Sequence, residues 1–238
     1  MLIVQSISQI MRLLLFDIDG TLIQSNPVGR QVMQLALEHV IGSAGLIESY
    51  PFAGKTDRRI IFDLLTDIGI SEEKILGFLP EVYAQMAKFG EKLFYQDGLS
   101  PCTGVIELIS RLSHRNDTLL GLQTGNILPT AHLKLDAAGL DATSFLIGAY
   151  GSDSAKREEL IPFALERATA MSGLIPHLVD VIVIGDTPSD IECAKANGVR
   201  SLAVATGSFS SETLAKYDPD FLLDDLSDTN AVIGFMLE

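Results

Sequence analysis

Short apolar runs alternate along the chain with longer segments in which apolar residues recur every three or four positions. The short runs suit buried strands, and the longer segments suit amphipathic helices. Strands that alternate with helices are typical of an α/β fold in which a doubly wound, Rossmann-like parallel sheet carries helices on both faces. The predicted strands span residues 12–18, 118–124, 144–150, 181–187 and 201–206.

The interval between the first two predicted strands is far longer than one crossover helix requires, so it contains an insertion. Apolar residues at helical spacing within it predict a small helical bundle over 28–41, 57–68 and 81–94. The apolar pattern that follows predicts the crossover helix of the sheet over 104–114, with Thr103 as its N-cap.

Polar, glycine and proline residues break the periodicity near 24–26 and 96–101, which places the hinges of the insertion there. We therefore expect two domains and a short extension. They are a helical domain at 25–97, an α/β domain formed by 11–24 and 98–238, and an extension outside the fold at 1–10.

The charge of the chain narrows the classes of partner. Lysine and arginine number 17 and aspartate and glutamate 31, so the formal net charge is −14. Such a field repels nucleic-acid phosphates and anionic lipid heads, so we expect no nucleic-acid or membrane partner. No apolar run approaches the roughly 18 residues of a membrane span, and the first residues do not resemble a signal peptide. Cys102 and Cys193 have no metal-ligand spacing, and two free thiols in a soluble, cytoplasmic protein are the expectation.

Candidate chemistry gathers where the predicted strands end, because ligands of a doubly wound sheet bind beyond the carboxyl ends of its strands. Asp17 and Asp19 follow the first strand and precede Gly20, which permits a sharp turn. Two like charges in one cavity repel each other unless a cation or a shared proton relieves them. An EF-hand loop is the alternative, but the next ligand positions do not fit it.

Later strand ends add further polar groups. Thr124, Gly125 and Asn126 follow the second strand, and their hydroxyl and backbone N–H groups could cradle an oxyanion. Asp186 and Asp190 follow the fourth strand, and Asp190 could also cap the next helix. Asp186 would converge with the first aspartates on a hard cation such as Mg²⁺, which prefers oxygen ligands.

Two cationic segments complete the set. Lys156 and Arg157 follow the third strand, where either could neutralise an aspartate nucleophile and hold a phosphate. In the insertion, Lys55 and Thr56 precede an amphipathic helix, and Thr56 or Asp57 suits its N-cap. As a hypothesis, this loop closes over the site and Lys55 contacts the distal anionic part of a substrate.

The motifs occur in a characteristic order: DIDGT at 17–21, Thr124 and Gly125, Lys156 or Arg157, and GDTPSD at 185–190. In this order the chain, from residue 11 to its end, resembles the haloacid dehalogenase (HAD) superfamily of phosphohydrolases. The inserted helices resemble its C1 cap. FAGKTD in the insertion and IECAKANGV after GDTPSD make the chain most similar to the phosphoglycolate phosphatase-like branch.

The resemblance implies roles for the residues at the strand ends. Asp17 would be the nucleophile that becomes an aspartyl phosphate, and Asp19 the general acid and then the base. Thr124 and the N–H of Gly125 would bind the phosphoryl oxygens. Asn126, Lys55 and Thr56 are further candidate substrate contacts because of their places in the turn and the loop described above, and not through the resemblance. Mg²⁺ would be held by the Asp17 side chain, the Asp19 carbonyl and Asp186, with Asp190 as an additional carboxylate.

One departure from the family pattern leaves a choice open. Family members commonly carry a lysine followed closely by proline in the third motif, whereas here Lys156 is followed by Arg157 and the nearest proline is Pro162. The sequence does not decide which of the two cations fills the role.

The resemblance favours a Mg²⁺-dependent phosphatase acting on a small phosphorylated metabolite, with phosphoglycolate as a guess. Dehalogenases of the superfamily lack the second aspartate that stands here as Asp19. Phosphonoacetaldehyde hydrolases place a Schiff-base lysine in the cap, for which Lys55 is the candidate, but they usually carry a small residue in place of Asp19. A phosphomutase is a further alternative. A receiver-like binding module fits poorly because receivers are about half this length and lack the insert. The sequence does not fix the oligomeric state.

Overall fold

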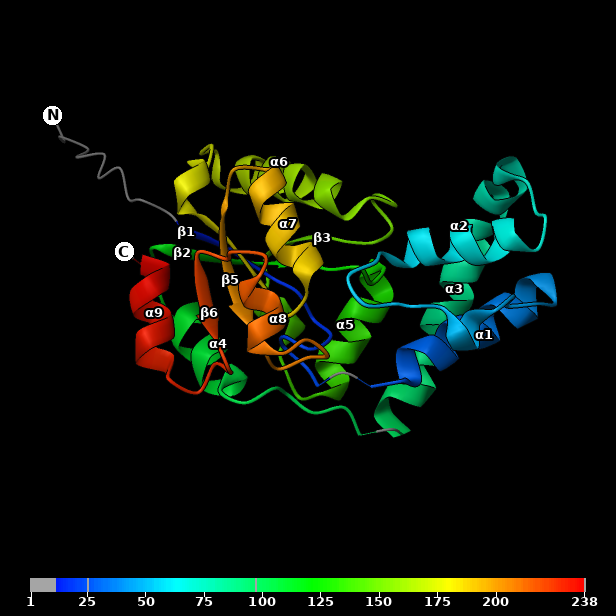
Figure 1. The fold of residues 1–238 in the computed structure, drawn as a ribbon, viewed down its shortest axis with the longest axis horizontal. Coiled ribbons are helices and arrows are strands. Elements are labelled where there is room, and N and C mark those ends of the chain that lie inside the picture. The colour runs from blue at the N-terminus through cyan, green and yellow to red at the C-terminus, as the bar shows by residue number, and fades with distance from the viewer. Residues whose placement is uncertain (1–11, 25, 97, 238) are drawn as a thin grey trace, which may run out of the picture.

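One parallel six-stranded sheet forms the centre of the computed structural model, which describes residues 12–24, 26–96 and 98–237 (Figure 1). The strand order is β3-β2-β1-β4-β5-β6, so the chain winds outward from β1 in both directions. This confirms the predicted α/β class; the predicted extension at 1–10 lies outside the described residues. The strands are β1 (Arg12–Phe16), β2 (Thr118–Gln123), β3 (Ile147–Ala149), β4 (Val181–Gly185), β5 (Arg200–Val204) and β6 (Phe221–Leu223).

The central strand shows why a continuous apolar run predicts a doubly covered sheet. Leu14 and Phe16 belong to one buried cluster, and Leu13 and Leu15 belong to another on the opposite face. Successive side chains of a strand point to opposite faces, so a strand covered on both faces must be apolar at every position.

Helices supply both covers. On one face lie α4 (Val105–Ser113), α5 (Leu128–Ala137) and α9 (Thr229–Leu237), and on the other lie α6 (Leu160–Ser172) and α7 (Pro188–Ala196). The short helix α8 (Ser211–Ala215) packs beside β6 at the edge of the sheet. None of the helices in the described residues is both long and apolar enough to cross a membrane.

A helical insert, defined here as α1 (Val28–Ile41), α2 (Asp57–Asp67) and α3 (Glu72–Gln96), lies at one end of the sheet (Figure 1). Its helices cover the segments predicted from the periodicity. Their buried residues share one hydrophobic cluster with the sheet, and α3 packs against α5. The division of the chain into two domains therefore stays a prediction.

Three local expectations are wrong. Helix α3 begins at Glu72, well before residue 81, and continues through Pro80. The N-cap of α4 is Gly104, with φ of 84°, in place of Thr103. Glycine is required there because a side chain would collide with the backbone of Leu226. The third strand is shorter than predicted and spans only Ile147–Ala149. Its predicted start at residue 144 belongs to a 3₁₀ turn, which Asp141 caps by accepting a hydrogen bond from the Thr143 N–H at 2.9 Å.

Candidate active site

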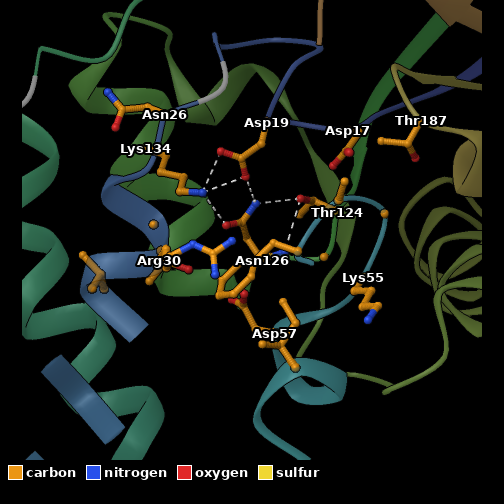
Figure 2. A pocket seen from close by; sticks show the side chains of 18 of the residues that line it. Asp17, Asp19, Asn26, Arg30, Lys55, Asp57, Thr124, Asn126, Lys134 and Thr187 are labelled. Atoms are coloured by element: carbon orange, nitrogen blue, oxygen red, sulfur yellow. Dashed lines mark hydrogen bonds and ion pairs between the residues drawn. The ribbon is translucent and has the colours of Figure 1, made fainter. Parts of the chain in front are cut away.

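A cavity of about 370 Å³ opens at the carboxyl ends of β1, β2 and β4, beneath the helical insert (Figure 2). Parallel strands end at the same edge of a sheet, which brings together side chains that are distant in sequence. Most of the predicted site residues line it: Asp17, Asp19, Lys55, Thr124, Gly125, Asn126, Arg157 and Asp186.

Three buried carboxylates lie close together at the strand ends, and two of them, Asp17 and Asp186, line the cavity. Asp17 follows β1, Asp186 follows β4, and Asp190 lies in the first turn of α7. All three side chains are buried, and each offers an oxygen within 4.8 Å of the others. We refer to these residues as the carboxylate cluster.

Glycines make room for this packing. A side chain at Gly20 or Gly207 would collide with the Asp186 carboxylate, and one at Gly185 would collide with Asp190. Gly20 also has φ of 86°, a conformation that other residues rarely adopt. The glycine after the first aspartates is therefore needed both for the turn and for the space.

Arg157 supplies positive charge to the cluster. Its Nη2 lies 2.7 Å from Asp17 Oδ2 and 2.6 Å from Asp190 Oδ1. Burial still outweighs this attraction and raises the pKa of Asp17 to about 6. Burial and the neighbouring carboxylates likewise raise the pKa of Asp186 well above its usual value, and its side chain accepts a hydrogen bond from Thr21 at 3.1 Å. The cluster thus carries more negative charge than Arg157 offsets, as expected of residues that could bind a divalent cation through oxygen atoms.

Lys156 lies outside this arrangement. Its side chain is 65% exposed, and its Nζ lies 3.3 Å from Glu159 Oε1. The 3₁₀ turn Arg157–Glu159 instead directs Arg157 inward. Of the two alternative cations that the sequence left open, the structure brings Arg157 and not Lys156 to the carboxylate cluster.

Asp19 faces away from the cluster and toward Lys134 of α5 (Figure 2). Lys134 Nζ lies 2.7 Å and 2.6 Å from the two Asp19 carboxylate oxygens. Burial would raise the pKa of Asp19, but Lys134 and a hydrogen bond from Asn126 outweigh it and hold the pKa below its usual value. Sequence reasoning missed Lys134. The available signal was a lysine on the apolar stripe of α5, between Ala131 and Leu135.

The turn after β2 lies beside Asp19, to which the Asn126 side chain donates (Figure 2). The Thr124 hydroxyl accepts hydrogen bonds from the Asn126 side chain at 3.0 Å and from its backbone N–H at 3.3 Å. The Gly125 carbonyl accepts a hydrogen bond from the Asp57 N–H at 2.7 Å. A side chain at Gly125 would collide with the Lys55 carbonyl, so glycine allows the insert to approach the strand end.

Residues 54–57, which lead into α2, form a segment that lies against the strand ends. The Thr56 hydroxyl donates to the Ala155 carbonyl at 3.0 Å and caps α2 by accepting from the Arg59 N–H at 3.2 Å. Thr56 therefore caps and anchors α2, as one of its two sequence interpretations has it, and is not among the residues that line the cavity. Lys55 donates to the Tyr50 hydroxyl at 2.7 Å, and its ammonium points away from the aspartates (Figure 2).

Two charged residues of the insert, Asp57 and Arg30, line the cavity without having been predicted as site residues. Asp57 is buried and accepts a hydrogen bond from the Ile127 N–H at 2.9 Å, and burial raises its pKa to about 6. The guanidinium of Arg30 lies 4.2 Å from the centre of the Phe52 ring and donates to the Ile47 carbonyl. Asp57 ends the FAGKTD segment, whereas Arg30 lies on α1, where no motif marks it and its place depends on how the helices pack.

The known proteins that this chain resembles include hydrolases and phosphatases. The family model of the haloacid dehalogenase-like hydrolases matches residues 14–204. Pyrophosphatase PpaX of Listeria welshimeri is 26% identical over 92% of this chain and 95% of its own length. Phosphoglycolate phosphatase 1 of Pseudomonas aeruginosa is 27% identical over 91% of this chain and 78% of its own. The crystal structure of a hydrolase from Pseudomonas syringae superposes with a TM-score of 0.67 at 20% identity and covers 96% of this chain and 100% of the other.

Proposed function

The chain belongs to the haloacid dehalogenase-like hydrolase family, and we propose that it is a Mg²⁺-dependent phosphatase that cleaves the phosphomonoester of a small metabolite through an aspartyl phosphate. The observation that carries this proposal is the buried carboxylate cluster, in which Asp17 lies at the edge of the cavity and contacts Arg157. Phosphoryl transfer depends mainly on positioning and charge neutralisation, and these residues supply both.

The carboxylate cluster fits Mg²⁺ by its chemistry. Asp17, Asp186 and Asp190 offer oxygen atoms in a buried space, and their charge exceeds that of the arginine beside them. We propose that these side chains, with the backbone carbonyl of Asp19, hold the ion. When bound, Mg²⁺ offsets the negative charge of the carboxylates and of a phosphate beside them.

Asp17 is the proposed nucleophile. Its carboxylate oxygen forms a bond to phosphorus as the bond from phosphorus to the leaving oxygen breaks. With a pKa of about 6, Asp17 is largely ionised at neutral pH, and Arg157 helps to keep it so. The hydroxyl of Thr124 and the N–H of Gly125 are proposed to hold the phosphoryl oxygens during the transfer.

Asp19 is the proposed acid and base. Lys134 and Asn126 lower the pKa of Asp19, so only its minor protonated form donates a proton to the leaving oxygen. The carboxylate left by that step then accepts a proton from the water that cleaves the aspartyl phosphate. Asp19 lines the same cavity as Asp17, and its side chain is 37% exposed, so it can reach both the leaving group and water.

The cavity limits the substrate to a small molecule. Its volume of about 370 Å³ lies near the lower end of the range for ligand pockets. The relatives named a pyrophosphatase and a phosphoglycolate phosphatase make pyrophosphate and phosphoglycolate the first compounds to test. The alternative of C–P cleavage through a Schiff-base lysine is disfavoured because Lys55 points toward Tyr50.

Phosphate release tests the proposal. We would assay p-nitrophenyl phosphate, pyrophosphate, phosphoglycolate and a panel of sugar phosphates, with Mg²⁺ and with EDTA, for the wild type and Asp17→Asn. We expect turnover that requires Mg²⁺ and is lost in the variant. A well-folded, Mg²⁺-loaded wild type that releases phosphate from none of these compounds would refute the proposal, and so would full activity of Asp17→Asn.

A further inference from the structure

Lys134 is a buried cation that takes no part in the proposed steps of phosphoryl transfer. Its side chain is only 6% exposed. Its Nζ contacts both oxygens of Asp19, at 2.7 Å and 2.6 Å, and Asn126 Oδ1 at 2.8 Å. An ammonium group has three N–H donors, and these three contacts account for them. Lys134 therefore has no N–H left with which to bind a substrate, although it lines the cavity.

Asn126 closes the arrangement around Asp19. Its side-chain N–H group donates to Asp19 Oδ2 at 2.7 Å and to the Thr124 hydroxyl at 3.0 Å (Figure 2). The Asp19 carboxylate thus has partners on both oxygens, all from the segment that runs from the end of β2 into α5. Such a network restricts the carboxylate to one orientation.

The helical insert completes the enclosure of Lys134. A Cβ atom added to Gly29 of α1 would lie 3.2 Å from Lys134 Nζ, and the ring centre of Phe94 of α3 lies 5.8 Å from it. Glycine at position 29 therefore leaves just enough room for the ammonium beneath α1. Because the insert excludes water from this side, the contact with Asp19 is stronger than it would be in solvent.

We propose that Lys134 is a positioning residue that fixes the carboxylate of Asp19 at the cavity, and that α1 holds Lys134 in place. The inference rests on the proposed function in one respect, because it is the acid and base role of Asp19 that requires a fixed orientation. Catalytic geometry is sensitive to displacements of about 1 Å. Loss of Lys134 should therefore slow the reaction without weakening substrate binding.

Lys134→Met tests this proposal, since methionine keeps the length of the side chain and removes the donors. We expect kcat to fall by about 10–100-fold and KM to change by less than about threefold. The matched control is Lys195→Met, which alters a lysine that is 47% exposed on α7 and should leave both constants unchanged. A raised KM with unchanged kcat would overturn the proposal in favour of direct substrate binding. A lower melting temperature with unchanged kcat would overturn it in favour of a purely structural role.

Gly29→Ala is a second variant that keeps every charged group. Its added methyl should push Lys134 Nζ by a few tenths of an ångström and lower kcat by a few-fold at constant KM. The proposal would be contradicted if the crystal structure of Gly29→Ala showed a displaced ammonium and the kinetic assay gave an unchanged kcat.

Crystal structures of the wild type and Lys134→Met provide a readout that does not depend on turnover. We expect the Asp19 carboxylate to rotate or to lose its ordered position in the variant. An unmoved carboxylate would refute the positioning role even if no ester were hydrolysed. Failure of the inference can therefore be told apart from failure of the proposed function, which would appear as an inactive wild type.

Discussion

Replacement of Arg157 by methionine would test whether its guanidinium holds the carboxylate cluster together. The side chain is buried and contacts Asp17 at 2.7 Å and Asp190 at 2.6 Å. Methionine fills much of the same space without charge, so Arg157→Met removes this cation with limited loss of packing. At every pH at which the carboxylates are ionised, we expect the metal-free variant to have a lower free energy of unfolding than the metal-free wild type.

The size of the stability loss in Arg157→Met follows from the burial of the ion pair. Removing one partner of a buried ion pair costs about 3–5 kcal/mol, because the remaining charge stays in a medium that solvates it poorly. The cost depends on pH, since burial raises the pKa of Asp17 to about 6 in the folded protein even with Arg157 present. Above this pKa Asp17 is ionised and the full cost applies. Below it, a proton on Asp17 replaces part of what the guanidinium supplies.

Urea denaturation in EDTA at about pH 5 and about pH 8 would measure the free energy of unfolding of the wild type and of Arg157→Met at each pH. We expect a loss of about 3–5 kcal/mol at the higher pH and a clearly smaller loss at the lower pH. Arg157→Lys is the control, because it keeps the charge but lacks the planar fork that reaches both carboxylates, and it should lose less. A loss below about 1 kcal/mol at the higher pH, or equal losses at both, would refute the reasoning.

Three further predictions concern neighbouring residues. Burial raises the pKa of Asp57 from 3.8 to about 6, so its ionisation costs the folded state up to about 3 kcal/mol above pH 6 and nothing below about pH 4. Asp57→Asn should recover this free energy of unfolding at about pH 8, and urea denaturation that gives an unchanged pH dependence would contradict it. Asp186→Asn relieves repulsion in the cluster, so calorimetry should find a higher melting temperature without metal and a much smaller rise on addition of Mg²⁺; a wild-type-like response to Mg²⁺ would argue against the proposed ligand. Gly125→Ala should lower the free energy of unfolding by about 1–3 kcal/mol because its methyl meets the Lys55 carbonyl. Gly77→Ala, in open space on α3, is the control, and equal stability of the two variants would be the contrary result.

Much of the fold could be predicted because its central strands are covered on both faces. That cover makes β1 and β4 apolar at nearly every position, which is visible in the sequence. The edge strand β6 is apolar as well, but it has only three residues, all half-buried, and so short a run does not predict a strand. The predicted helix begins only at residue 81, directly after Pro80, because a proline inside a helix is rare.

Some residues of the candidate site could likewise be predicted from the sequence, and others could not. Asp17, Asp19 and Asp186 could be predicted to lie near one another because each closes a strand, and parallel strands end at one edge. Lys134 and Arg30 lie on helices, and their distance from the strand ends is set by tertiary packing that no local pattern records. The choice between the two neighbouring cations likewise depended on the direction of a short 3₁₀ turn, which either residue could have occupied.

The segment 54–57 also determines how the protein could be redesigned. Its residues are tied to the strand ends by the Thr56 hydroxyl on Ala155, the Asp57 N–H on Gly125 and the Asp57 carboxylate on the Ile127 N–H. A chimera that exchanges the helical insert with that of a relative would break these contacts if the exchanged piece included the segment. Grafts intended to change specificity should therefore keep residues 54–57 with the sheet and exchange the helices on either side of them.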